Sequence, residues 1–438
     1  MAGANFSAVV LDAIGAPDDC RPRGTMVAVP QDCQDARISS TVATKAARAA
    51  YYVCQRMMRY VLLLIGMFGA AIVYSIGGYA AYTLLLYLFC ALVLLIGIMV
   101  IVRGRLRDLC LVTSSILLCF IFVEVYHVFG SRAWPEQQEK VSFVPDPSLG
   151  WSPSAPGTFH SKKVDRKSDR VIFDVANTID QHLQRKTISN EGGPTVAFFG
   201  DSFTFGEGLQ DSETLPQTFS DLENQRLRIL NFGISGYGPQ QFLRAMETGI
   251  FRTRLRNSRL FVFLTAPWHA ERTSCLNPSM LRSPRYIMKD GQVTYTGACA
   301  YGPLRILWEI VGHSAAYRAL LSPTFTKLNP TDIDLYIAIV ARAIELARKE
   351  YGVPTLILYL PFAPEYLSQT GYTDADIMQK LREAGAYVVD AAINPAEHPG
   401  VDLFIPGDGH PTGAANRLWA KMIKDWVDKN AVPVDILF

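Results

Sequence analysis

The hydrophobic residues of this 438-residue chain are concentrated in its first third. Residues 60–102 form 43 consecutive positions without a formal charge, and only seven of these positions fall outside the apolar set. A membrane span needs about 20 apolar residues, so the run is long enough for two helices that reverse at Gly77 and Gly78. A third run, over residues 109–130, is uncharged except for Glu124. The pattern predicts three transmembrane helices, at about 60–78, 81–102 and 109–130.

Beyond about residue 190, short apolar runs alternate with amphipathic stretches. The runs that fit strands cover 195–199, 227–232, 260–265, 355–360 and 386–389, and the stretches that fit helices cover 239–251, 332–350, 374–384 and 412–428. Such alternation predicts a parallel sheet covered by helices on both faces. Residues 132–190 are polar with few periodic signals. We interpret them as a lead-in that either packs against the α/β domain at 191–438 or acts as a spacer.

Basic and acidic residues are nearly equal in number over the chain as a whole. The 42 Lys and Arg residues face 40 Asp and Glu residues, and the formal net charge is +2. Residues 135–438 carry 31 basic and 33 acidic side chains. A nucleic-acid-binding protein would have a basic domain or stripe, so this balance argues against a nucleic-acid partner.

The basic residues near the apolar runs predict the orientation in the membrane. Residues 45–59 contain four of them before the first span, and residues 103–107 contain three between the second and third spans. Cytoplasmic flanks carry an excess of Lys and Arg, so both flanks are predicted to be cytoplasmic. We therefore expect a multi-pass protein of the cell inner membrane, the span region being 59–131. Residues 1–58 would be a loosely ordered cytoplasmic extension, and everything after about residue 131 would be periplasmic or otherwise extracytoplasmic.

Two of the eight cysteines, Cys275 and Cys299, belong to the predicted exported domain. An isolated pair in an oxidising compartment is a disulfide candidate. Residues 285–295 fit a β-hairpin that turns at Asp290 and Gly291, which would bring the two sulfur atoms together. The alternative is a pair of unrelated buried thiols.

Residues capable of catalysis follow the predicted strands, where parallel sheets place their ligands. Ser202 comes directly after the first strand, in a segment rich in glycine, and a second glycine-rich segment at 231–238 follows the second strand. Asp408 and His410 lie just before the last helix. A serine hydroxyl becomes a good nucleophile when a histidine accepts its proton and a carboxylate orients that histidine. The chain contains one such set.

These residues resemble the SGNH/GDSL hydrolase family. In that family a Gly-Asp-Ser block carries the nucleophile, and an Asp-x-x-His or Asp-x-His block near the C-terminus carries the base. The match covers about residues 195–427. The resemblance implies a flavodoxin-like three-layer α/β/α domain with Ser202 as nucleophile, His410 as general base and Asp408 as its orienting carboxylate. It also implies that the backbone N–H groups of Ser202 and Gly236 form part of an oxyanion hole.

The third sequence block departs from the family pattern. It normally reads Asn-Asp-x-x-Arg after the third strand, and the asparagine amide is an oxyanion donor. If Arg272 keeps its place, Trp268 and His269 stand where Asn and Asp would be. Loss of one oxyanion donor can cost about 10²- to 10³-fold in turnover. We expect either that His269 or Trp268 donates instead, or that the chain is slow or inactive on ordinary esters.

The resemblance implies a serine esterase, and the predicted membrane anchoring favours an acylated envelope substrate, such as a polysaccharide or a lipid. A lipid esterase or a thioesterase would fit as well. Two further alternatives remain open. The chain could be an O-acetyltransferase of a cell-envelope polysaccharide, or a catalytically degenerate module that binds esters or glycans. We expect no metal and no cofactor, because the chain has no Cys-x-x-Cys, no His-Glu-x-x-His and no phosphate-binding loop with its lysine.

Overall fold

A computed structural model provides the architecture of the chain. It describes residues 57, 60, 61, 63–66, 69, 81–130, 136–139, 141–165, 168–277, 280–300, 311, 312, 314–322 and 327–430. The chain divides into two compact units, Met1–Val123 and Glu124–Phe438. The predicted extension at 1–58 and most of the first predicted span at 60–78 lie outside the described residues.

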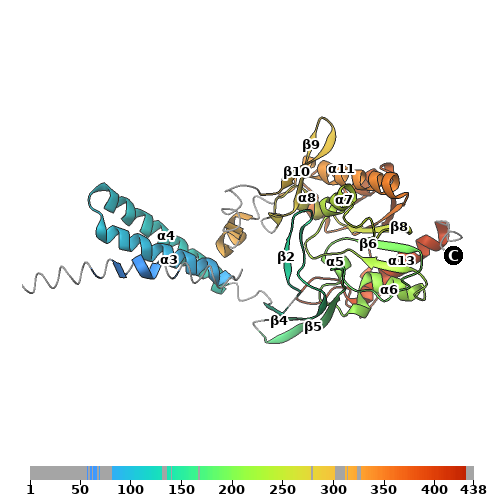
Figure 1. Ribbon diagram of the computed structural model, residues 1–438, viewed down its shortest axis with the longest axis horizontal. Coiled ribbons are helices and arrows are strands. Elements are labelled where there is room, and N and C mark those ends of the chain that lie inside the picture. The colour runs from blue at the N-terminus through green and yellow to red at the C-terminus, as the bar shows by residue number, and fades with distance from the viewer. Residues whose placement is uncertain are drawn as a thin grey trace, which may run out of the picture. The chain divides into compact units, whose positions relative to one another are not determined.

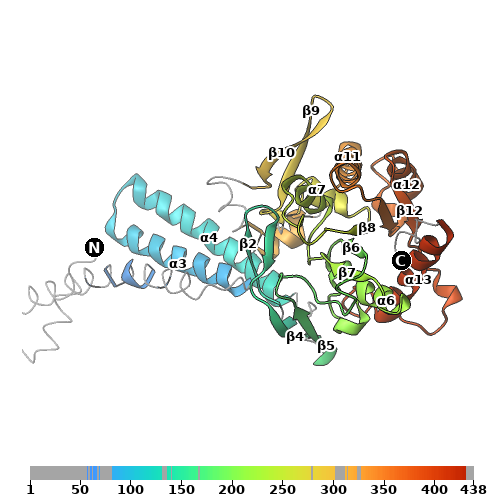
Figure 2. The same cartoon turned by 45° about the vertical axis from the view of Figure 1, so that its right-hand side comes forward.

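Two long apolar helices, α3 (Ala81–Ile101) and α4 (Arg105–Gly130), run side by side (Figures 1 and 2). Within them, Leu84–Ile101 and Arg105–Val128 are long and apolar enough to cross a membrane, judged by length and composition. Large apolar side chains are exposed on both helices, for example Phe89 at 57% and Phe122 at 66%. A helix that is apolar all round needs an apolar surrounding. The described residues thus contain two such helices, not the three that the sequence predicts.

A five-stranded parallel sheet forms the centre of the second unit (Figure 1). In sheet order the strands are β12 (Tyr387–Asp390), β11 (Thr355–Tyr359), β8 (Ser258–Thr265), β6 (Thr195–Phe199) and β7 (Arg228–Asn231). Every neighbouring pair is parallel. Counted along the chain, this is the order 2-1-3-4-5 of flavodoxin-like folds. The predicted α/β class with a parallel sheet is confirmed.

Helices cover both faces of this sheet (Figure 2). One face carries α6 (Leu215–Leu222) and α13 (Gly413–Asn430), and the other carries α7 (Pro239–Thr248), α11 (Pro330–Leu346) and α12 (Asp374–Glu383). Side chains alternate along a strand, so in β6 Phe198 packs on the face covered by α6 and α13, and Phe199 packs on the opposite face. The described chain also contains α8 (His269–Thr273), the 3₁₀ turns Asp211–Glu213, Pro364–Tyr366 and Pro395–Glu397, and the π turns Tyr317–Leu321 and Ala347–Tyr351.

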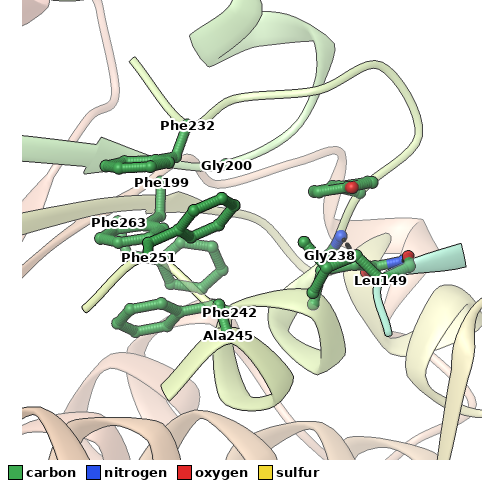
Figure 3. Close-up of a pocket in the computed structure, with 11 residues that line it drawn as sticks. Leu149, Phe199, Gly200, Phe232, Gly238, Phe242, Ala245, Phe251 and Phe263 are labelled. Atoms are coloured by element: carbon green, nitrogen blue, oxygen red, sulfur yellow. Dashed lines mark hydrogen bonds between the residues drawn. The ribbon is translucent and has the colours of Figure 1, made fainter. Parts of the chain in front are cut away.

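Phenylalanine rings fill the layer between the sheet and α7 (Figure 3). The Phe199 ring lies 5.0 Å from that of Phe232 and 4.6 Å from that of Phe242, measured between centroids. The cavity that these rings line has a volume of only ≈10 Å³. That is about the space of one water molecule, so this interior holds no substrate and acts as a rigid support for the loops above it.

The lead-in is a small β structure that packs against the α/β domain. Strands β1 (Glu136–Glu139), β4 (Gly157–Asp165) and β5 (Arg170–Ile179) form an antiparallel sheet, and β2 (Phe143–Asp146) pairs with β3 (Gly150–Pro153). Phe173 and Val175 of β5 are buried against Leu209 and Ile405. The indole N–H of Trp151 donates to the carbonyl of Ser235 at 3.0 Å. Of the two alternatives, the lead-in therefore packs and is not a spacer.

A hairpin of β9 (Pro284–Lys289) and β10 (Gln292–Ala298) has the predicted turn. Asp290 and Gly291 both have positive φ, at 51° and 77°. Two central residues of positive φ are what a two-residue type I′ turn requires. Next to this hairpin a disulfide joins Cys275 to Cys299, the pair that the sequence predicts, with Cα atoms 5.5 Å apart.

Candidate active site

Ser202 is the first residue of a single-turn helix, α5 (Ser202–Phe205), directly after β6. The turn begins at Asp201, whose carboxylate accepts a hydrogen bond from the backbone N–H of Phe203 at 3.0 Å. It ends at Gly206, whose φ of 85° favours glycine. Asp201 is fully buried and Ser202 is 7% exposed. The Ser202 hydroxyl makes no hydrogen bond to any residue that the structure describes, so it is free to react at the carboxyl end of the sheet.

Asp201 connects the end of β6 to α8, the short helix that follows β8. Between β6 and β8 the chain order of the strands in the sheet changes direction. The Oδ2 of Asp201 accepts from the Nε2 of His269 at 3.1 Å and from the guanidinium of Arg272 at 2.8 Å. Burial would raise the pKa of Asp201, but the Arg272 charge and the His269 hydrogen bond outweigh it and hold the pKa well below its usual range. Asp201 is thus an ionised anchor beneath the Ser202 turn.

His269 lies inside the protein, with no exposed side-chain surface. Its Nδ1 is 2.9 Å from the Thr265 hydroxyl, which in turn lies 2.9 Å from the hydroxyl of Tyr336. Burial and the Arg272 charge lower the pKa of His269, so the ring is neutral. An ionised Asp201 only accepts, which assigns the proton to Nε2 and makes Nδ1 the acceptor from Thr265. Both ring nitrogens are therefore engaged, and no N–H remains for an oxyanion; the expectation of a His269 donor is wrong for this physical reason.

Trp268, the other predicted donor, lies beside the nucleophile turn. Its ring packs against those of Phe203 and Phe362, with centroids 5.6 Å and 5.3 Å away. The indole N–H has no acceptor among the described residues. Of the two residues that the third block suggested, Trp268 is the one with a free donor.

Asp408 and His410 form a close pair in the loop before α13. The Asp408 Oδ2 lies 2.5 Å from the Nδ1 of His410, and its Oδ1 lies 2.5 Å from the ammonium of Lys163 on β4. Burial would raise the pKa of Asp408, but the hydrogen bonds and charge interactions with His410 and Lys163 lower it to about 2. Asp408 is thus ionised over the physiological range and held from two sides.

The other nitrogen of His410 faces the nucleophile turn. The imidazole lies 5.6 Å from the Phe203 ring, between centroids, and its Nε2 is 3.8 Å from the carboxylate of Glu207. Burial would lower the pKa of His410, but the hydrogen bond to Asp408 and the Glu207 charge outweigh it and raise the pKa above its ordinary value. No hydrogen bond joins His410 to Ser202 within the described residues. In enzymes without substrate such bonds are often long and form only in the reactive complex.

The loop after β7 brings Gly236 to the same edge. Asn231 fixes this loop, because its amide donates to the Thr204 carbonyl at 2.9 Å and its oxygen accepts from the Gly233 N–H at 2.9 Å. A Cβ at Gly233 would lie 2.5 Å from the backbone of Phe205, so only glycine permits this approach. Gly236 has a φ of 84°, and its N–H makes no hydrogen bond to a described residue. The donor that the family pattern places here is thus available.

Three further residues shape the site, and sequence reasoning did not single them out. Lys163 and Glu207 contact Asp408 and His410, as described above. Arg185 is fully buried, and its guanidinium donates to Asp211 at 2.9 Å and to the Leu209 carbonyl at 2.9 Å, which holds the loop after the nucleophile turn. Glu207 is the one that local sequence could have suggested, since it lies five residues after Ser202. Lys163 and Arg185 come from the lead-in, and no local signal ties them to the site.

Among the described residues, no group of three or more His, Cys, Asp or Glu side chains is arranged to hold a metal ion. No family model matches the chain, and no curated protein matches it.

Several solved structures are similar to it. A lipolytic protein of the G-D-S-L family from Veillonella parvula is 13% identical, over 53% of this chain and 96% of its own, with a TM-score of 0.31. The psychrotrophic esterase EstA from a Pseudoalteromonas species is 14% identical, over 54% and 97%, with a TM-score of 0.32. The α/β hydrolase LAE5 from the metagenome of Lake Arreo is 14% identical, over 55% and 97%, with a TM-score of 0.29. At such TM-scores the function must be argued from the chain's own residues.

Proposed function

We propose that this chain is a membrane-anchored serine esterase. Ser202 is the nucleophile, His410 is the general base and later the general acid, and Asp408 orients the imidazole. The observation that carries the proposal is the pair of Asp408 and His410, 2.5 Å apart, whose imidazole lies 5.6 Å from the ring of Phe203, the residue after Ser202. Carboxylate, imidazole and hydroxyl in this order are the constellation of serine hydrolases.

The reaction proceeds in two halves. The Ser202 oxygen bonds to the carbonyl carbon of the ester while His410 takes its proton, and the negative charge develops on the carbonyl oxygen. The N–H groups of Ser202 and Gly236 receive this charge, and the Trp268 indole is the candidate for a third donor. The intermediate then expels the alcohol, which takes the proton from His410. Water attacks the acyl-enzyme by the same route and releases the acid.

Two observations support the electrostatics that this reaction needs. Asp408 is ionised, so it can stabilise the imidazolium that forms when His410 accepts the proton. The raised pKa of His410 makes it a stronger base than a free imidazole. The buried, ionised Asp201 lies beneath the same turn and holds it to the end of β8 through His269 and Arg272.

A serine-directed fluorophosphonate probe tests the chemistry. We expect wild-type protein to be labelled at Ser202 and to give a burst of p-nitrophenol from p-nitrophenyl acetate. Ser202→Ala should abolish both. If intact wild-type protein shows neither labelling nor turnover, the esterase proposal is wrong and a degenerate binding module is the better description. Diversion of the acetyl group from water to an added sugar would identify the O-acetyltransferase alternative.

The anchoring is part of the same proposal. The apolar lengths of α3 and α4 support a multi-pass inner-membrane protein, and the disulfide supports an oxidising compartment for the catalytic domain. With basic flanks on the cytoplasmic side, the domain would be periplasmic and would act on acylated envelope material, a polysaccharide or a lipid. We expect the chain to stay in the membrane fraction after alkaline extraction, and a protease added to spheroplasts to degrade the domain. Recovery in the alkaline supernatant would contradict the anchoring.

A further inference from the structure

A pocket of ≈300 Å³ adjoins the reaction centre, and both the lead-in and the α/β domain build it. Phe143, Trp151 and Ser161 come from the lead-in, and Phe205, Glu207 and Gly236 come from the α/β domain. Gly236 carries the free N–H described above, and Glu207 lies 3.8 Å from the Nε2 of His410. A group bound in this pocket is therefore within reach of the bond that Ser202 would cleave.

The aromatic wall of the pocket is rigid. The indole of Trp151 is fixed by its bond to the Ser235 carbonyl, and the Tyr237 hydroxyl donates to the Trp151 carbonyl. A Cβ at Gly236 would lie 3.1 Å from the Trp151 ring, so that ring lies against Gly236, whose N–H is the candidate oxyanion donor. A preformed aromatic surface beside the reaction centre suits a saturated ring that presents C–H groups on one face.

The polar side of the pocket has a single strong acceptor. One oxygen of Glu207, Oε2, accepts from the Ser235 hydroxyl at 2.7 Å. The other, Oε1, makes no hydrogen bond to any residue that the structure describes, although the side chain is only 22% exposed. A carboxylate beside a hydrocarbon chain would lose hydration without compensation, which disfavours a fatty acyl chain here. It would also repel an anionic ligand, whereas a hydroxyl can donate to it.

We propose that this pocket binds the alcohol part of the ester, and that this part is a neutral sugar ring whose hydroxyl donates to Glu207. The inference rests on the esterase function proposed above. When the bond between Ser202 Oγ and the acyl carbon forms, the bond between that carbon and the sugar oxygen breaks. The proton passes from Ser202 through His410 to the sugar oxygen. Glu207 is thus a specificity-determining residue for the leaving group.

Matched acetyl esters on the full-length chain in detergent test the proposal. The neutral substrate is methyl 3-O-acetyl-β-D-glucopyranoside, its anionic match is the corresponding glucuronoside, and acetylcholine is the cationic comparison. We expect wild-type kcat/KM to favour the neutral sugar over the uronate by about tenfold or more, the size expected for a like-charge contact. Glu207→Gln should lower the rate on the neutral sugar relative to p-nitrophenyl acetate and reduce the preference over the uronate to about threefold or less.

Glu350→Gln is the matched control, because Glu350 is an exposed carboxylate paired with Arg252 at 3.7 Å. It should retain the wild-type preference. Equal kcat/KM for the two sugars, a preference that Glu207→Gln does not change, or a preference for acetylcholine would overturn this inference while esterase activity remained. If the wild type does not hydrolyse p-nitrophenyl acetate at all, the proposed function is wrong, and this inference is wrong with it.

Discussion

Two aspartate–histidine pairs lie at the Ser202 turn, and their histidines differ in burial and in the direction of the pKa shift. Asp201 and His269 are both fully buried, while His410 keeps 20% of its side chain exposed beside Asp408. The pKa of His269 is lowered and that of His410 is raised. A histidine inside a filled hydrogen-bond chain cannot accept the proton of Ser202, whereas one with a free nitrogen at the surface can.

Burial and the neighbouring charges together explain why the pairs differ. Arg272 bonds to the same oxygen of Asp201 as His269 does, so the carboxylate has its counter-ion and His269 stays neutral. Lys163 bonds to Oδ1 of Asp408, which leaves Oδ2 to His410 alone. Glu207 then adds a second negative charge on the far side of the His410 ring. Burial and the charges around each ring thus decide which histidine can become an imidazolium.

Removal of each imidazole gives the largest contrast. We expect His410→Ala to lower kcat on p-nitrophenyl acetate by about 10³-fold or more, with the circular dichroism spectrum unchanged, because the general base is lost. A His410→Ala variant with wild-type kcat would assign the base to another residue.

His269→Ala should act mainly on stability. It removes a hydrogen bond to a buried charge, leaves the Thr265 hydroxyl with Tyr336 as its remaining partner and opens a cavity. We expect the free energy of unfolding to fall by about 3 kcal/mol, as measured by urea denaturation. Unchanged stability together with a large loss of kcat would mean that His269 takes part in the reaction and would abolish the contrast.

Lys163→Met tests the cation on the exposed pair. Without the ammonium, Asp408 loses one of its two anchors, so we expect kcat to fall about tenfold with little change in KM. Lys162→Met is the matched control, because the neighbouring Lys162 pairs with Asp174 at 3.6 Å and does not contact Asp408. Lys163→Arg should restore part of the rate. If the Lys162 and Lys163 variants lower kcat equally, the contact between Lys163 and Asp408 is not the cause of the loss.

The pH profile gives the smallest effect. His410 acts as a base only when neutral, so kcat/KM should fall as pH decreases through its raised pKa, with an inflection above pH 6.5. Glu207→Gln removes one of the charges that raise this pKa, so the inflection should move to lower pH. His269, with a lowered pKa and no exposure, should leave no inflection of its own. A shift to higher pH in Glu207→Gln would contradict the assignment of the charges.

The sequence predicted most of the α/β domain because its signals are local. A buried parallel strand such as Thr195–Phe199 is a short apolar run, and the turn at Asp290 and Gly291 has its own conformational preference. The lead-in sheet was missed, although β5 carries the signal. Its buried side chains Phe173, Val175, Asn177 and Ile179 recur at every second residue. The sequence of β5 does not alternate cleanly, because the buried face includes the polar Asn177 and the opposite face includes the apolar Ile172 and Ala176.

In the candidate site, too, some residues could be predicted from local sequence and others could not. The Gly-Asp-Ser and Asp-Gly-His segments and the Asn231 loop identify Ser202, Gly236, Asp408 and His410 from their order in the chain, because each is a local motif after a strand. The sequence could not predict that His269 lies beneath Asp201. The burial of His269 depends on α11 and β8 packing together, which brings Tyr336 and Thr265 to the ring.

Lys163 reaches Asp408 across 245 positions of sequence, and Glu207 meets Ser235 and His410 only when the loop after β7 and the loop before α13 come together. Periodicity and short motifs therefore determine which elements form and which residues can react. The charge state of each imidazole, and the shape of the pocket beside it, come from packing between distant segments. These properties depend on burial and on the distance to other charges, and only the folded chain defines either.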